Sequence, residues 1–165
     1  MHMHKLEKIW LLVGVGALLI FLTILGISAF YLGNQPASCL ATIDPAKVDT
    51  TPPFNEPGLV KVDSEEYDYQ LTFVASAFAY YPNKVQIPQG ARVKIVATTK
   101  DVVHGFQMAG TNVNMMLEPG YISEYTATFD KPGEFLILCN EYCGVGHHMM
   151  NAKVEVVSNA QALNN

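Results

Sequence analysis

A long hydrophobic stretch comes first along the chain. No charged residue occurs from Ile9 to Leu32, and at about 1.5 Å per residue a helix over this range can cross a hydrocarbon core of about 30 Å. The stretch is longer than the apolar part of a cleaved signal peptide, which is roughly 7–15 residues, and no clear cleavage site follows it. The pattern therefore predicts a retained transmembrane helix over residues 9–32.

Basic residues on either side of this stretch predict its orientation. Lys5 and Lys8 precede it, whereas the next basic residue along the chain is Lys47. Positively charged flanks of a membrane helix stay on the cytoplasmic side. We therefore expect residues 1–8 in the cytoplasm and everything that follows the helix on the outer face of the membrane.

Two further regions follow the predicted helix. Residues 33–62 contain prolines spaced among aspartates and threonines, which is typical of an extended linker. From residue 63 on, short segments rich in β-branched and aromatic residues alternate with turn signals. These segments are 67–75, 84–88, 92–99, a piece around His104, 121–129, 134–139 and 152–157. About 100 residues enclose one core, so we expect residues 63–165 to form a single all-β domain, a β-sandwich or Greek-key barrel.

Metal-binding side chains gather near the carboxyl end of this predicted domain. Cys139 and Cys143 are followed by His147 and Met150, and a lone histidine, His104, lies upstream. Thiolate, imidazole and thioether groups together suit copper. A mononuclear blue-copper site needs only one cysteine, so the second is informative. Two bridging thiolates could hold two copper ions, each capped by one histidine, with the methionine as a weak outer ligand.

Other interpretations of these side chains stay open at this point. A disulfide is ordinary in an exported domain, but it would leave the histidines and the methionine unexplained. Two cysteines and two histidines could hold structural zinc, although the methionine at a fixed offset argues against it. A membrane-tethered copper carrier or blue-copper electron-transfer protein could use the same types of ligand.

The loop resembles that of subunit II of the haem–copper cytochrome c oxidases. The dinuclear copper A centre of that family has the pattern C-x-E-x-C-x-x-x-H-x-x-M with a distant histidine, and CNEYCGVGHHMM and VVHGF contain every element. ASAFAYYPNKVQIPQGARV, VVHGFQMAGTNVN and KPGEFLILCNEYCGVGHHMM are similar to successive parts of the family's domain. A single membrane anchor is typical of the B-type branch. The resemblance implies a cupredoxin-like copper A domain on one helix, in the plasma membrane of a prokaryote.

The same resemblance implies which residues hold the two copper ions. The family's spacing selects His147 over His148 and Met150 over Met149. The backbone carbonyl of Glu141 is implied as a weak ligand beside the cysteines and the upstream histidine. A magnesium ion at the Glu141 carboxylate belongs to the longer-studied branch and is left open here, although a hard carboxylate oxygen suits it.

A docking site and partners are implied as well. Phe78, Tyr80 and Tyr81 lie where the family carries an aromatic patch for its cytochrome c donor. Residues 9–165 carry 8 basic and 14 acidic side chains, a net charge of −6, which would attract a basic donor. We expect the chain to pass electrons from cytochrome c to haem in subunit I, where dioxygen is reduced to water and protons are pumped. A small accessory membrane subunit is a further expected partner.

Two classes of function are excluded by motifs that the sequence lacks. No C-x-x-C-H run is present, so we expect no covalently attached haem on this chain. No basic patch is present either, so a nucleic-acid partner is not expected.

Overall fold

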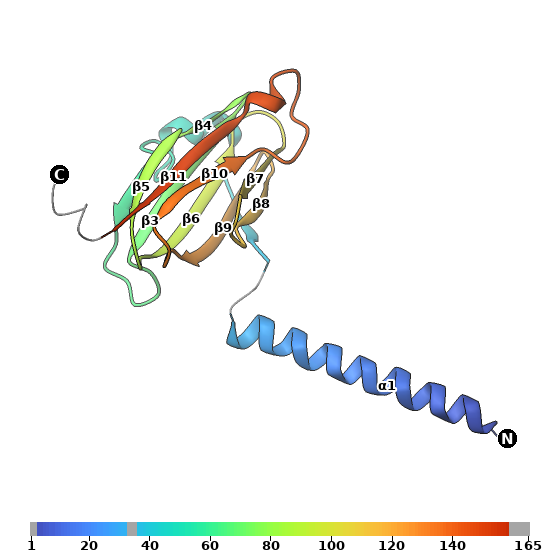
Figure 1. Cartoon of the computed structure of the whole chain (residues 1–165). Helices are drawn as coiled ribbons and strands as arrows, with labels where there is room; N and C mark the ends of the chain where they lie inside the picture. Colours follow the sequence, from blue (N-terminus) through green and yellow to red (C-terminus); the bar gives the residue numbers. More distant parts are fainter. Residues whose placement is uncertain (1–2, 33–35, 159–165) are drawn as a thin grey trace. The chain divides into compact units, whose positions relative to one another are not determined.

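The computed structural model describes residues 3–32 and 36–158, so the first residues of the predicted linker, 33–35, lie outside the described residues. It divides the chain into two compact units, one ending at Pro36 and the other beginning at Ala37 (Figure 1). The first unit is helical and the second consists mainly of β-strands.

The helical unit consists of α1 (Lys5–Gly26) and a short π-helical continuation, η1 (Ile27–Tyr31). A capping box begins α1, because the His4 ring accepts a hydrogen bond from the Leu6 N–H and the Glu7 carboxylate accepts one from the His4 N–H. None of the residues of α1 or η1 is buried. With a mean hydropathy of 2.6, this is the one helix in the described part of the chain that is long and apolar enough to cross a membrane.

Short strands and 3-10 helices make up the second unit. In chain order they are β1 (Ser38–Thr42), η2 (Pro45–Thr50), β2 (Gly58–Lys61), β3 (Tyr69–Ser76), β4 (Ala79–Tyr81), β5 (Lys84–Pro88), β6 (Arg92–Thr99), β7 (His104–Met108), β8 (Asn114–Leu117), β9 (Tyr121–Thr128), β10 (Gly133–Leu138), η3 (His147–Met149) and β11 (Asn151–Val157). Most of these strands are rich in β-branched and aromatic residues, which fit a half-buried pleated surface.

Two sheets face each other in this unit (Figure 1). The first has the order β1-β9-β6-β3-β2, with β4 paired to β3, and the second has the order β5-β11-β10-β7-β8. The pairs β3–β6 and β5–β11 are parallel and the other pairs are antiparallel. Parallel neighbours cannot be joined by a hairpin, so the chain passes through the other sheet between them. Residues far apart in sequence therefore meet at the same end of the sandwich.

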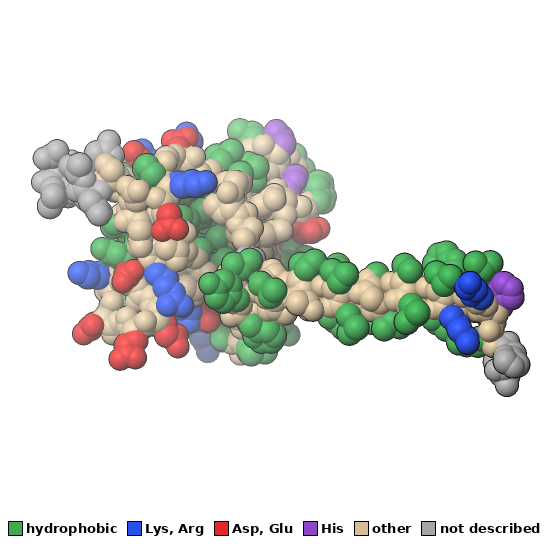
Figure 2. All heavy atoms as spheres, turned by 60° about the horizontal axis from the view of Figure 1, so that its bottom comes forward, with side chains coloured by type: hydrophobic (Ala, Val, Ile, Leu, Met, Phe, Trp, Pro, Cys, Tyr) green, Lys and Arg blue, Asp and Glu red, His purple; other side chains and the backbone are tan. Residues whose placement is uncertain are grey.

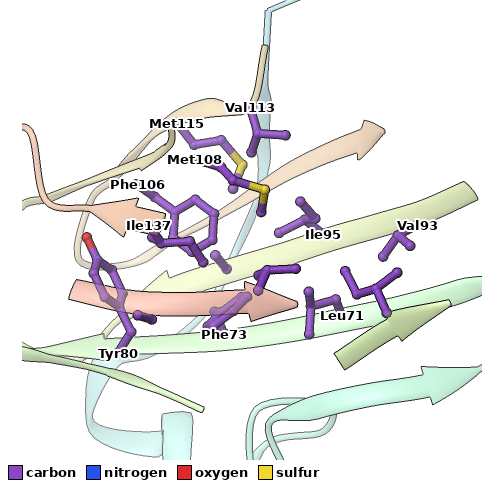
Figure 3. Close-up of a cluster of buried hydrophobic side chains, with 14 of the residues drawn as sticks. Leu71, Phe73, Tyr80, Val93, Ile95, Phe106, Met108, Val113, Met115 and Ile137 are labelled. Carbon is purple, nitrogen blue, oxygen red and sulfur yellow. The ribbon is translucent and has the colours of Figure 1, made fainter. Parts of the chain in front are cut away.

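The main core lies between the two sheets (Figure 3). Leu71, Phe73 and Ile95 enter it from β3 and β6, and Phe106 and Ile137 enter it from β7 and β10, all fully buried. The Phe73 and Phe106 rings meet edge to face, 5.0 Å between centroids. Successive residues of a strand point to opposite faces, and this alternation fills the core from both sheets.

Residues 33–62, predicted to be an extended linker, contain β1, η2 and β2. Val48 and Phe54 are buried, and they pack with Val74 and Val96 in a second, smaller core. The two latter valines each follow a residue that faces the main core, so their side chains lie on the other face of the six-stranded sheet. The prolines did set the turns here, but the apolar residues between them cover a sheet face, which makes the segment part of the domain.

Candidate metal centre

Strand pairing brings the predicted ligands to one end of the sandwich. His104 begins β7, and Cys139 directly follows β10. These strands are antiparallel neighbours with Leu138 opposite Gln107, so the end of β10 lies on the same edge as the start of β7. The loop from Cys139 to Met150, which we call the metal loop after its predicted ligands, then leads into β11. A histidine and a cysteine that are distant in the sequence therefore lie side by side.

Four of the predicted ligands form a row of soft donor atoms. The sulfur atoms of Cys139 and Cys143 are 3.7 Å apart, and both cysteines are free. At one end of the row His104 Nδ1 lies 4.0 Å from Cys139 Sγ, and at the other end His147 Nδ1 lies 3.6 Å from Cys143 Sγ. The order is imidazole, thiol, thiol, imidazole, which places one ring beyond each sulfur.

Two weaker donors lie against this row. Met150 Sδ is 3.8 Å from Cys143 Sγ, and the Cys139 thiol donates a hydrogen bond to the backbone carbonyl of Glu141 at 3.1 Å. All six groups that the sequence pattern selected therefore converge, one weak donor beside each cysteine. The neighbouring His148 and Met149 are exposed at the loop surface.

Burial differs along the row. His104 and Met150 are buried, and Cys139 is only 8% exposed. Cys143 and His147 are half-buried. The centre thus has an inner end in the core and an outer end near solvent.

The Cys143 thiol and a nearby tyrosine keep their protons at neutral pH in the metal-free chain. Burial, followed by the adjacent Cys139, raises the pKa of the Cys143 thiol to about 11. Burial, again followed by Cys139, also raises the pKa of Tyr80, whose hydroxyl donates a hydrogen bond to the Gly105 carbonyl. A metal ion bound as a thiolate complex must therefore displace the proton of Cys143.

Asp101 is a residue of the site that the sequence analysis did not single out. Its Oδ1 atom lies 2.9 Å from His104 Nε2 and accepts a hydrogen bond from the Val102 N–H, and its Oδ2 atom accepts one from the Ala77 N–H. Burial raises the pKa of Asp101, but the hydrogen bonds from His104 and from the two backbone N–H groups outweigh it and lower the pKa overall. An acidic residue three positions before a predicted ligand was the signal available in the sequence.

Glycines allow close packing around the ligands. A Cβ atom on Gly105 would lie 2.7 Å from the backbone nitrogen of Asn140, so only glycine fits beside the start of the metal loop. Gly144 and Gly146 lie directly under the ring of Phe78, and a Cβ on Gly144 would be 3.0 Å from that ring. The metal loop is therefore held from β7 on one side and from Phe78 on the other.

The three aromatic residues predicted to dock a donor differ in exposure. Tyr80 is fully buried, with its ring edge-on to Phe106, so the prediction is wrong for this residue. The physical reason is the alternation of β4, which points Tyr80 into the core and its neighbour Tyr81 outward. Phe78 is 38% exposed and Tyr81 is 50% exposed. The latter two remain available to a partner.

The most exposed hydrophobic residues near the ligands lie in the metal loop itself. We call Tyr142, Val145 and Met149 the loop patch; they are 76%, 89% and 70% exposed. The Tyr142 ring lies 5.8 Å from that of His147. Figure 2 shows hydrophobic side chains beside the histidine side chains visible on the β unit. The sequence analysis missed this patch, because exposure of a loop residue depends on how the loop packs.

Comparisons with known proteins point to one family. Residues 65–157 match a family model described as cytochrome c oxidase subunit II, periplasmic domain. A cytochrome c oxidase subunit 2 from Thermus thermophilus is 36% identical over 152 residues, covering 91% of this chain and 90% of that protein. A second protein of that name, also from Thermus thermophilus, is 40% identical over 124 residues, covering 75% of this chain and 92% of that protein.

Solved structures agree with these relatives. A chain in the cryo-EM structure of a heme–copper terminal oxidase dimer superposes with a TM-score of 0.77 at 31% identity, covering 93% of this chain and 100% of that chain. The periplasmic domain of subunit II of the cytochrome oxidase of Bradyrhizobium japonicum gives a TM-score of 0.53 at 18% identity over 64% of this chain and 93% of that one. The latter likeness concerns the fold alone. Together the two solved structures show that the β unit has the cupredoxin-like, all-β fold predicted from the sequence.

Proposed function

The chain belongs to the cytochrome c oxidase subunit II family, and from this premise we propose that it takes up electrons at a dinuclear copper centre in its β unit. It is a membrane-anchored, copper-binding subunit through which electrons enter a haem–copper oxidase. Its similarity to the Thermus proteins is consistent with the B-type branch. A separate copper carrier or blue-copper protein is not favoured.

The placement of two thiols between two imidazoles is the observation that supports a dinuclear centre. The ligand atoms of His104, Cys139 and Cys143 all lie within 4.8 Å of one another. Among the described residues His147 does not belong to that cluster, although its ring lies 3.6 Å from the nearer thiol. A tetrahedral zinc site would need all four donors around a single point. A row with a ring beyond each sulfur instead fits two ions bridged by both thiolates.

Each proposed ligand has a role that follows from its place in the row. The proposed ligands are His104, Cys139, Glu141 through its backbone carbonyl, Cys143, His147 and Met150. The two cysteines would bridge as thiolates, the two histidines would cap the ends, and the thioether and the carbonyl would bind weakly. When bound, two copper ions would accept one electron and share it. At the inner end, burial of the ligand side chains limits their movement and keeps water out, which lowers the reorganisation that electron transfer requires.

The loop patch is the proposed docking surface for the electron donor, a cytochrome c. Tyr142 contacts the ring of His147, the outer ligand, so a donor on the patch would lie next to the half-buried end of the centre. Exposed apolar side chains gathered at one place mark interaction sites.

The helical unit is the proposed membrane anchor. Lys5 and Lys8 would keep the amino terminus in the cytoplasm, with residues 9–32 in a prokaryotic plasma membrane and the β unit on the outer face. The chain is a partner of other oxidase subunits. We propose that these are subunit I, which carries the haem, reduces dioxygen to water and pumps protons, and a small accessory membrane subunit.

Magnesium at Glu141 would require help from a partner. The Glu141 side chain is exposed, and no group of three possible metal-binding side chains within the described ranges contains it. A magnesium ion at this carboxylate would therefore take its remaining ligands from another subunit, since Mg²⁺ needs six donors.

Electron paramagnetic resonance combined with metal counting tests the proposed centre. The full chain, solubilised in detergent and loaded with copper, should bind two copper ions per chain. Its spectrum should show hyperfine structure from one unpaired electron shared by two equivalent copper nuclei. A spectrum from a single copper nucleus, or a preference for one zinc ion, would contradict the dinuclear centre.

A further inference from the structure

Asp101 touches both parts of the chain that surround the ligand row. We infer that Asp101 is a positioning residue that ties the ligand His104 to the turn at Phe78, and thereby holds the inner and outer halves of the copper site together. The inference rests on the proposed copper function, but it concerns a residue that does not itself bind the metal.

The first contact of the carboxylate orients His104. Asp101 Oδ1 lies 2.9 Å from His104 Nε2, while His104 Nδ1 faces the Cys139 sulfur at 4.0 Å. An ionised carboxylate only accepts hydrogen bonds, so Nε2 must carry the ring proton. The lone pair is then left on Nδ1, the atom that faces the thiol row. The imidazole is fully buried, and no solvent molecule is needed to set its tautomer.

The second contact reaches the turn between β3 and β4. Asp101 Oδ2 accepts a hydrogen bond from the Ala77 N–H at 2.6 Å. Ala77 directly precedes Phe78, whose ring covers Gly144 and Gly146. These glycines lie between the outer ligands of the metal loop. The contacts therefore run from one capping histidine, through Asp101 and Phe78, to the loop that carries the other.

This connection matters because the outer half of the site is otherwise held mainly by local backbone contacts. Between Cys143 and His147 the chain forms no strand, and its backbone hydrogen bonds, continued by those of η3, join residues only three positions apart. Asp101 itself is held by two further donors, the Val102 N–H at 2.7 Å and the Thr99 hydroxyl at 3.2 Å. Because these donors fix the carboxylate, it can position the His104 ring at one oxygen and the Ala77 backbone at the other.

Two substitutions at Asp101 separate its contacts. In Asp101→Asn the amide oxygen can still accept from His104, but the amide NH₂ cannot accept from the Ala77 N–H. Asp101→Ala removes both contacts. Asp130→Asn is the matched control, because it removes the same charge from the exposed turn at the opposite end of β10 from Cys139. Each variant is prepared as the full chain in detergent, loaded with copper, and checked for folding by circular dichroism.

Three readouts test the positioning role: the rate of copper loss to excess chelator, the hyperfine pattern and the reduction potential. We expect Asp101→Ala to lose copper about 10 to 100 times faster than the unmodified chain, as is typical when the hydrogen-bond partner of a ligand is removed. Its hyperfine pattern should change, and its potential should rise because a negative charge no longer favours the oxidised metal. Asp101→Asn should lose copper at an intermediate rate, and Asp130→Asn should match the unmodified chain.

Several outcomes would overturn the inference. One is a folded Asp101→Ala variant with unchanged copper loss and an unchanged hyperfine pattern. Another is an equal rise in potential in both Asp101 variants without faster copper loss, which would mean that only the charge matters. If Asp101→Ala does not fold, unchanged copper loss in Asp101→Asn overturns it. A missing dinuclear signal in the unmodified chain would instead contradict the proposed function itself.

Discussion

At the scale of single residues, Cys143 and Met150 offer a metal two different kinds of sulfur. Cys143 lies at the centre of the row, 3.7 Å from the Cys139 sulfur and 3.6 Å from the His147 ring. Met150 contacts the row from the side, 3.8 Å from Cys143. A thiolate binds strongly and can bridge, whereas a thioether is a neutral, weak ligand. Their substitutions should therefore have different effects.

We predict that Cys143→Ser abolishes the paired copper centre, whereas Met150→Leu keeps two copper ions and shifts the reduction potential. A hydroxyl does not replace a bridging thiolate, while loss of a weak ligand leaves the bridge intact. Copper counting, electron paramagnetic resonance and potentiometry on the copper-loaded chain measure both effects. An unaltered spectrum in Cys143→Ser would refute the bridging role.

Gly105 is a second residue whose size decides the local structure. We predict that Gly105→Ala destabilises the domain by about 1–3 kcal/mol or more, because overpacking a close contact forces the backbone to shift. The added Cβ would lie 2.7 Å and 2.8 Å from the backbone nitrogens of Asn140 and Glu141. Denaturant unfolding gives the free energy.

A control separates backbone from side-chain crowding at this position. Asn140→Ala alone removes an exposed side chain whose amide donates to Asn114, so it should change stability by only about 0.5 kcal/mol. Combined with Gly105→Ala it should rescue little, since the backbone nitrogens remain in the way. Full recovery of stability in the double variant would contradict this explanation.

At the scale of elements, most strands were predictable from their composition, and four short ones were not. Strands β6 and β5 coincide with the segments 92–99 and 84–88 predicted from β-branched and aromatic composition. The strands β1, β2, β4 and β8 were not predicted. Each has three to five residues without the alternating β-branched residues that identified the equally short β5, and each is defined by the neighbour with which it pairs.

The segment around η2 provides a test at this scale. We predict that Phe54→Ala lowers the free energy of unfolding by about 3–5 kcal/mol, because Phe54 is buried against the outer face of the six-stranded sheet. Leu40→Ala, in the neighbouring strand β1, should change it by no more than about 0.5 kcal/mol, since Leu40 is 92% exposed.

Thermal or denaturant unfolding of the copper-free chain measures both variants. Equal, small effects of Phe54→Ala and Leu40→Ala would show that the segment is a linker, as the sequence had suggested, and that it does not belong to the folded domain.

At the scale of the whole molecule, electron uptake depends on what the β unit presents to a donor. The loop patch exposes apolar side chains next to the outer end of the ligand row, and the inner end is buried. Apolar contact depends little on ionic strength, whereas a charge-driven encounter falls steeply with added salt. The position of the patch therefore predicts donor binding that tolerates salt.

We predict that Val145→Asp lowers the kcat/KM of the assembled oxidase for its cytochrome c donor by about tenfold or more, because it places a charge in the centre of an apolar contact. The potential of the copper centre should stay close to that of the unmodified chain. Steady-state oxidation of reduced cytochrome c, measured at several salt concentrations, provides the test.

Val60→Asp is the matched control for this prediction. Val60 is also exposed, and it pairs with Gln70 on β3, far from the end of β3 that leads to Phe78. It should leave kcat/KM unchanged. An equal loss in both variants would argue against the loop patch as the docking surface.

Local patterns in the chain were enough to predict the long apolar helix, the fold class and a set of possible metal ligands between Cys139 and Met150. A membrane helix depends on a run of apolar residues, and a metal loop depends on the spacing of donors within a few positions. Long-range packing was required for the rest: the place of His104 beside Cys139, the contacts of Asp101, the burial of Tyr80 and the covering of a sheet by Phe54. These features arise where strands distant in sequence pair, and the free energy of that pairing depends on both partners at once.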